Sequence, residues 1–71
     1  MTTIGQKLRE AREEQRLSID KVFEATRIRM QYLQALEEDD LSIMPSAVQA
    51  RGYLRNYAEF LGLDVDKLLD E

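Results

Sequence analysis

The sequence contains no cysteine and no histidine. Without cysteine, neither a disulfide framework nor a cysteine-based zinc site can form. The absence of histidine removes the most common general base and the most common metal ligand. No apolar run approaches the roughly 20 residues of a membrane span, and the chain does not open on a signal-peptide pattern. We therefore expect a soluble protein of a reducing compartment, not an enzyme, with no cofactor, metal or small-molecule substrate.

The chain is short, with 71 residues, of which 44% are hydrophobic. A chain of this size buries only about 60% of the surface that its unfolded form exposes, so we expect a thin core. The length leaves no room for a second domain, and residues 1–71 are predicted to form a single one.

The net charge of −4 is unevenly distributed along the chain. Residues 1–36 carry a net charge of +2 and residues 41–62 carry +1, whereas the acidic run 37–40 contributes −4 and the tail 63–71 contributes −3. Nucleic-acid-binding domains usually present a basic face. The overall balance therefore argues against DNA as a ligand, although the cationic first half keeps DNA as an alternative.

The spacing of apolar residues predicts helices throughout and no strand of useful length. Side chains that can accept a hydrogen bond from the first turn of a helix mark four N-termini. These predicted N-caps are Thr3, Ser18, Ser46 and Asp64. Gly62 is a suitable left-handed stop after Leu61, and Pro45 interrupts the chain before the fourth helix. The prediction is an all-α, compact bundle of about five helices.

Apolar residues at helical spacing predict the core. They are Ile4, Leu8 and Ala11 in the first helix, Val22, Phe23 and Ala25 in the second, Leu33 and Leu36 in the third, and Ala47, Ala50, Leu54, Ala58 and Leu61 in the fourth. The acidic run 37–40 ends the third helix and lacks the spacing of a calcium loop, so we expect a solvated turn there. The connection 41–46 is too apolar for a solvated linker and is predicted to pack over the core.

The region between Ser18 and Glu37 has the organisation of a helix-turn-helix. Two short helices are separated by a few residues around positions 26–28, and in such a motif the second helix presents its face to a partner. The pattern alone is a moderate indication, because short helical hairpins are common in all-α domains.

Two stretches then make a family recognisable, YLQALE at residues 32–37 and RGYLRNY at residues 51–57. With them, the chain from Ile4 to about Asp64 resembles the amino-terminal cytoplasmic domain of RodZ-like cell-shape proteins, a variant of the phage-repressor or Xre-type helix-turn-helix. The resemblance implies that the domain binds the bacterial actin-like filament protein MreB. It also implies a cytoplasmic location and a parent protein that continues into a membrane span, so that contact with the membrane is made only by segments outside this chain.

The fourth predicted helix carries more aromatic surface than its bundle needs. Tyr53, Tyr57 and Phe60 widen the apolar arc of this helix to roughly 160°, and tyrosine is a preferred interface residue. RodZ-like domains dock on the filament protein through an aromatic pair one turn apart on this helix. We therefore predict a partner-binding surface of Tyr53, Tyr57 and Phe60 with Arg51 and Arg55 at its rim.

Plainer readings of the same helix stay open. Phe60 taken alone is more typical of a core residue, and Arg51 and Arg55 of a solvated face. Gly52 costs about 1 kcal/mol relative to alanine inside a helix. Gly52 is either an evolutionary remnant without a role or a place where another backbone approaches closely.

The alternative ligand is DNA, bound through the third predicted helix. Its candidate contacts are Arg27, Arg29, Met30, Gln31, Tyr32 and Gln34. The resemblance places the base-reading positions at Met30, Gln31 and Ala35, of which only Gln31 has a hydrogen-bonding side chain, suited to adenine. Arg27 and Arg29 are placed to hold phosphates, but are more typical of solvated surface arginines.

Two residues depart from the repressor pattern. Arg27 stands where repressors often have glycine, which is costly if the position requires a positive φ. Phe23 replaces the usual alanine of the second helix. It either wedges the two helices apart or enters the core between the first and fourth helices.

Overall fold

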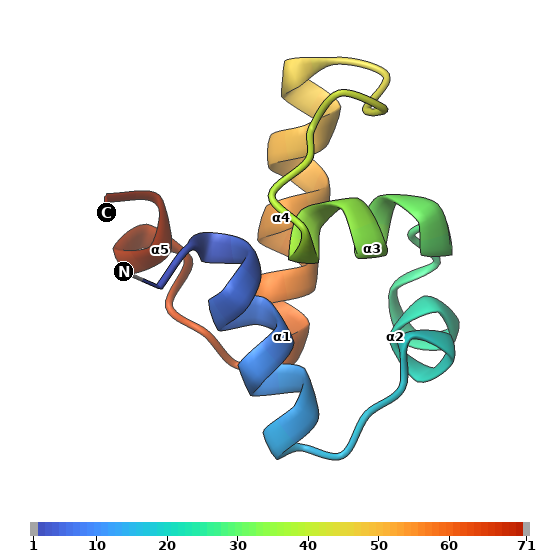
Figure 1. Cartoon of the computed structure of the whole chain (residues 1–71), viewed down its shortest axis with the longest axis vertical. Coiled ribbons are helices and arrows are strands. Elements are labelled where there is room, and N and C mark those ends of the chain that lie inside the picture. The colour runs from blue at the N-terminus through green and yellow to red at the C-terminus, as the bar shows by residue number, and fades with distance from the viewer. Residues whose placement is uncertain (1, 71) are drawn as a thin grey trace.

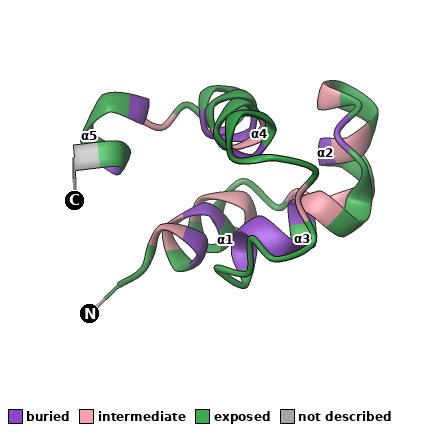
Figure 2. Cartoon of the chain, turned by 90° about the horizontal axis from the view of Figure 1, so that it is seen from above, coloured by how far each residue is buried: buried purple, intermediate pink, exposed green. Residues whose placement is uncertain are grey.

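The computed structural model describes residues 2–70 (Figure 1). This part of the chain is all-helical, as predicted, with α1 (Ile4–Glu14), α2 (Ile19–Thr26), α3 (Met30–Glu37), α4 (Ala47–Leu61) and α5 (Val65–Asp70). The longest helix, α4, lies between α5 on one side and α2 on the other, while α1 and α3 form the layer beneath it (Figures 1 and 2). None of the helices within residues 2–70 is long and apolar enough to cross a bilayer.

The four predicted N-caps and the predicted stop of α4 are confirmed. Thr3, Ser18, Ser46 and Asp64 each accept a bond from the backbone N–H three residues further on, and Thr3 with Gln6 forms a complete capping box. Gly62 ends α4 in the left-handed region, with φ of 81°. Local side-chain chemistry therefore sets where the helices begin and where α4 stops.

The core lies where α1, α3 and α4 face one another, and residues of α2, α5 and the α2–α3 turn close it (Figure 2). Its buried members are Leu8, Val22, Ile28, Leu33, Leu36, Tyr57, Ala58, Leu61, Val65 and Leu68. The predicted core is largely confirmed, but Ala25 and Ala47 are exposed and do not belong to it. Helical spacing alone predicts Ala25 as a core residue, but α2 buries only Val22 fully.

The α2–α3 turn has the backbone geometry that the sequence comparison with repressors anticipates. Arg27 adopts a left-handed conformation with φ of 62°, and its N–H bonds to the carbonyl of Phe23. The Arg27 guanidinium lies over the Phe23 ring, 5.7 Å from the centroid, an attractive cation–π contact. The Phe23 ring is half-buried and packs at the edge of the core.

The connection between α3 and α4 packs over the core less than predicted. Met44 contacts the core, but Leu41 and Ile43 are 56% and 48% exposed. The carboxylate of Asp40 accepts bonds from both the N–H and the hydroxyl of Ser42, and this tight turn directs the intervening Leu41 outward. The expectation of a buried loop is therefore wrong for Leu41 and Ile43.

The first turn of α1 packs directly on the end of α3. A Cβ atom added to Gly5 would lie 2.4 Å from the carbonyl oxygen of Glu37 and 2.6 Å from that of Leu36. The Gly5 N–H also donates to the Asp39 carboxylate at 2.9 Å. This close approach requires a residue without a side chain and fixes α1 against α3.

Candidate protein-interaction site

Tyr57 does not belong to the surface, contrary to the prediction. Its side chain is fully buried, and its hydroxyl donates a short hydrogen bond to the carboxylate of Glu37. The bundle covers this ring completely because Tyr57 points toward α3, where Glu37 satisfies its polar end. Tyr57 is therefore a core residue and cannot contact a partner of the folded domain.

Glu37 is the centre of a buried polar cluster that the sequence did not reveal. Its carboxylate accepts bonds from Nε of Arg12 at 2.7 Å and from Nε of Arg9 at 3.2 Å, besides the Tyr57 bond. The side chain is only 3% exposed, so the prediction of a solvated turn is wrong for Glu37, although Glu38, Asp39 and Asp40 are exposed. The cluster joins α1, α3 and α4 through one carboxylate.

The protonation states of this cluster follow from its contacts. Burial by itself would raise the pKa of Glu37, but the hydrogen bonds from Arg12 and Tyr57 outweigh burial and hold that pKa below its usual value. Burial and the bond to Glu37 raise the pKa of the Tyr57 phenol. The bond to Glu37 likewise raises the pKa of Arg12. Near neutral pH, Glu37 is thus a carboxylate and Tyr57 a neutral phenol, and the arrangement is that of a structural ion pair.

The remaining four residues of the predicted partner site lie wholly or partly on the outside of α4. Tyr53 is half-buried and Phe60 is 38% exposed. Arg51 and Arg55 are exposed, and Arg55 makes a long ion pair of 3.9 Å with Glu59. At about 100° per residue, Tyr53 and Phe60 occupy one flank of the exposed face and the two arginines the other.

Tyr53 extends this surface onto α3. Its ring stacks on that of Tyr32, with centroids 5.2 Å apart and planes inclined by 16°. Both rings are half-buried, so each supports the other and leaves part of its surface open. The aromatic flank of α4 is therefore continuous with α3.

The other candidate DNA contacts lie on the surface at the start of α3. Arg27, Arg29, Gln31 and Gln34 are exposed, and Met30 is 38% exposed. Arg29 stands at the N-cap of α3 without a side-chain capping bond. Ala35 is buried, so the assignment of Ala35 as a base-reading position is wrong. Of the three base-reading positions that the resemblance gives, Gln31 alone has an exposed side chain that can hydrogen-bond to a base edge.

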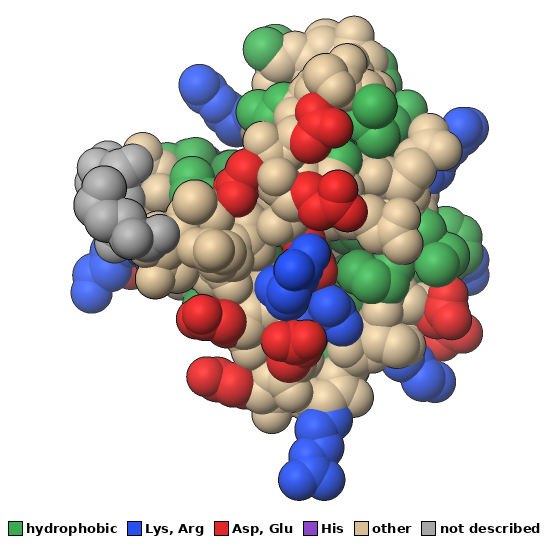
Figure 3. Space-filling model, viewed as in Figure 1, with side chains coloured by type: hydrophobic (Ala, Val, Ile, Leu, Met, Phe, Trp, Pro, Cys, Tyr) green, Lys and Arg blue, Asp and Glu red, His purple; other side chains and the backbone are tan. Residues whose placement is uncertain are grey.

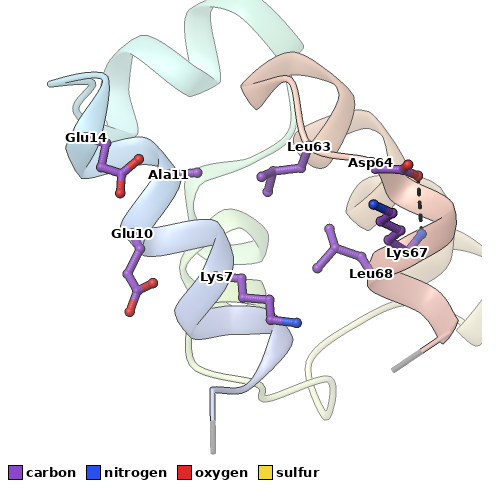
Figure 4. Close-up of a pocket in the computed structure, with 8 residues that line it drawn as sticks. All are labelled: Lys7, Glu10, Ala11, Glu14, Leu63, Asp64, Lys67 and Leu68. Atoms are coloured by element: carbon purple, nitrogen blue, oxygen red, sulfur yellow. Dashed lines mark hydrogen bonds between the residues drawn. The ribbon is translucent and has the colours of Figure 1, made fainter.

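The hollow between α1 and α5 does not resemble a catalytic site. One of about 340 Å³ lies between α1 and α5, where the side chains of Leu63 and Leu68 point into the gap (Figure 4). Its rim mixes the charges of Lys7, Glu10, Glu14, Asp64 and Lys67. No group of three or more acidic side chains within residues 2–70 is placed to hold a metal ion.

The face formed by α1 and α3 presents mixed charge rather than a basic patch. Figure 3 shows Lys and Arg side chains at its centre surrounded by acidic ones, with hydrophobic side chains toward the upper end of α4 and near α2 and α3. Arg9 and Arg12 are committed to Glu37 on this face. It is therefore poorly suited to a phosphate backbone.

A family model described as a helix-turn-helix domain matches residues 7–68. The chain belongs to this helix-turn-helix family. Within it the domain is RodZ-like, because it is 41% identical over 68 residues to the cytoskeleton protein RodZ of Streptococcus pneumoniae. It is also 42% identical over 55 residues to the uncharacterized membrane protein YmfM of Bacillus subtilis.

These alignments cover 96% and 78% of this chain but only 25% and 19% of the two relatives. The chain thus spans about a quarter or less of the curated relatives that it matches. No solved structure matches it significantly. The RodZ-like resemblance in the sequence is confirmed for the domain.

Two residues of this helix-turn-helix domain escaped the sequence reasoning. Glu37 follows Leu33 by one turn and thus falls on the apolar face of α3, and Gly5 lies in the first turn of a well-capped helix. The position of Glu37 on that face was a usable indication, which the acidic run after it concealed. Nothing local marks Gly5, because its neighbour is 32 residues away along the chain.

Proposed function

We propose that this domain is a non-enzymatic protein-interaction module of a RodZ-like cell-shape protein. Its partner is an actin-like filament protein of the MreB type, bound by the outside of α4. The parent protein holds the domain at the cytoplasmic face of the membrane through segments outside this chain.

The observation that carries the proposal is the partly exposed aromatic flank of α4. Phe60 is 38% exposed, Tyr53 keeps part of its ring open although it packs against the core, and two exposed arginines lie on the opposite flank. Aromatic residues and arginine are the types enriched at interface hot spots. The similarity to a relative named as a cytoskeleton protein supports a partner of that kind.

The chemistry of the described residues supports binding rather than catalysis. The chain has no histidine or cysteine. The one strongly coupled titratable cluster, within residues 2–70, is buried around Glu37 with its hydrogen bonds satisfied. Such a cluster offers neither an accessible base nor a nucleophile.

Removing the aromatic flank is expected to weaken filament binding strongly. The variant Tyr53→Ala with Phe60→Ala should co-sediment with MreB-type filaments at least about tenfold more weakly than the wild type, since interface aromatics carry a large share of binding energy. Phe60→Ala alone avoids disturbing the Tyr32 stack and should lose part of the affinity. Glu13→Ala, an exposed change on α1, serves as the matched control.

Circular dichroism and thermal unfolding establish that each variant keeps its fold. Folded variants that co-sediment like the wild type would refute the assignment of α4 as the binding surface. Tyr57→Ala is unsuitable for this experiment, because Tyr57 is buried and its loss damages the core.

DNA is the second candidate ligand, which the exposure of Gln31 and Gln34 on α3 and of Arg27 and Arg29 just before this helix supports. In a gel-shift experiment at low salt we expect at most a non-specific shift that disappears as salt is added. A single bidentate glutamine provides only about 1–3 kcal/mol of discrimination. A sequence-selective shift that Gln31→Ala weakens would instead favour a transcriptional regulator.

A further inference from the structure

Helix α5 is short and lies at the edge of the bundle (Figures 1 and 2). It contains six residues, of which Val65 and Leu68 are buried members of the core. Asp66 and Lys67 are exposed, and Leu69 is 39% exposed. Helices shorter than about 12–15 residues are marginal in water on their own. The helical state of α5 therefore depends on the packing of Val65 and Leu68.

Two hollows border α5. The first, of about 340 Å³, separates it from α1, and the side chains of Leu63 and Leu68 point into this gap (Figure 4). The second, of about 450 Å³, lies between Leu69 of α5 and the first half of α4, where Ala50 and Leu54 line it. Protein interiors are otherwise close-packed, and a side chain that faces a hollow lacks the dispersion contacts of a filled one. The contact that holds α5 is thus incomplete toward both neighbouring helices.

The chain up to α5 is fixed by bonds that do not involve this helix. The side-chain amide of Gln15 donates to the carbonyl of Leu61 at 2.7 Å and ties the end of α4 to the end of α1. The N–H of Leu63 bonds back to the carbonyl of Ala58 at 2.9 Å. Asp64, by contrast, accepts its bonds from within α5 itself, with its carbonyl and its carboxylate. Movement of α5 as a unit would leave all of these bonds intact.

We propose that α5 is a strap that opens and closes as a unit while α1 to α4 keep their native structure. The two hollows and the small buried contact make the closed strap less stable than the rest of the domain. The Glu37 cluster, which joins α1, α3 and α4, holds the remaining bundle together when the strap is open.

The open strap gives the domain an extensible connection. Residues 63–70 span at most roughly 28 Å when they are fully extended. In the proposed function, the membrane-attached segments of the parent protein continue from this end of the domain. Tension between the membrane and a partner bound to α4 then extends the strap before it loads the bundle. This role under tension rests on the proposed function, whereas the opening itself depends only on the domain.

Native-state hydrogen exchange of the chain, followed by NMR, tests the opening. The amide of Leu68, which bonds to the carbonyl of Asp64, should exchange at least about 100-fold faster than the amides of α3. Its exchange should also accelerate with low concentrations of urea, because cooperative opening exposes apolar surface. Exchange of Leu68 that is as slow as that of α3, or that does not respond to urea, would refute the strap.

Two variants separate opening of the strap from unfolding of the whole domain. Leu68→Ala weakens the closed state alone and should accelerate exchange in α5 and α3 alike, by at least about tenfold. If it leaves the strap permanently open, α5 should lose its protection while the signals of α1 to α4 stay native. Glu37→Gln weakens the closed and the open state equally. It should accelerate exchange in α3 about 100-fold and leave α5 unchanged. Equal acceleration of α5 and α3 in Glu37→Gln would show that α5 unfolds only with the whole domain, which refutes the inference.

Single-molecule pulling tests the role under tension. The chain has no cysteine, so Glu59→Cys on the exposed side of α4 and one cysteine added after Glu71 provide unique attachment points. A reversible extension of at most roughly 28 Å should precede the rupture of the bundle. A single rupture without this step would refute the role under tension. Failure of the wild-type domain to co-sediment with MreB-type filaments would refute the proposed function, while the exchange experiment would still decide whether the strap opens.

Discussion

Replacing Glu37 by glutamine should lower the free energy of unfolding at neutral pH by about 3 kcal/mol, because it leaves a largely buried arginine without its counter-charge. The Arg12 guanidinium, whose side chain is 15% exposed, bonds to both oxygens of the Glu37 carboxylate. A domain of this length has a total stability of about 4–10 kcal/mol. Urea unfolding followed by circular dichroism measures the loss directly.

The same substitution should change how stability depends on pH. Because the pKa of Glu37 is lowered in the folded state, its contribution is fully present above the usual value of 4.5 and is lost as the pH falls through the folded pKa. The wild type should therefore lose stability below pH 4.5 more steeply than Glu37→Gln. Parallel curves for the two proteins would show that Glu37 does not titrate as the structure requires.

Two further variants act as controls for this cluster. Tyr57→Phe removes only the hydroxyl that bonds to Glu37 and should cost less, about 1.5–3 kcal/mol for a bond to a charged group. The double variant Arg12→Met with Glu37→Gln should lose less unfolding free energy than the two single variants lose together. In the double variant neither residue is a buried charge without its partner. Simple additivity would contradict a direct Arg12–Glu37 interaction.

Replacing Gly5 by alanine should be the second large effect, a loss of about 3 kcal/mol, at the upper end for overpacking. The new Cβ atom would lie 2.4 Å from a backbone oxygen of Glu37, and a backbone atom cannot move aside as a flexible side chain can. Helix α1 must shift away from α3, which weakens the contact of Arg9 and Arg12 with Glu37. Thermal or urea unfolding provides the measurement.

The matched control is the same substitution at Gly52, which has open space around it. Gly52→Ala should stabilise the isolated domain by about 1 kcal/mol, the difference in helix propensity. Opposite signs for one chemical change at two helical glycines would establish that packing on α3 dominates at Gly5. Equal stabilisation at both positions would refute the close approach of α1 to α3.

The sequence predicted those features of the fold that depend on neighbours along the chain. The caps at Thr3, Ser18 and Ser46 and the stop at Gly62 each involve residues three or four positions apart, and all were found. Helical periodicity identified most of the core for the same reason. The helix-turn-helix organisation then followed from the order and length of the helices.

The parts that could not be predicted depend on contacts between distant residues. Arg12, Glu37 and Tyr57 come from three helices, and the sequence indicates only that Glu37 falls on the apolar face of α3, not which side chains of α1 and α4 it meets. The misassignment of Tyr57 to the partner surface followed from this. A wide apolar arc on a helix indicates an exposed binding surface only when no buried polar group bonds to one of its side chains. Here Glu37 accepts a hydrogen bond from Tyr57, which draws that ring into the core.

The buried carboxylate also has a mechanical consequence for the outer face of α4. Tyr57 lies on the same helix as Tyr53 and Phe60 but points inward, where its hydroxyl reaches Glu37 and, through it, two arginines of α1. A force applied to the outside of α4 is therefore distributed over three helices, and α4 does not detach from the bundle on its own. Yielding under tension should then be a single cooperative rupture of the α1–α3–α4 assembly.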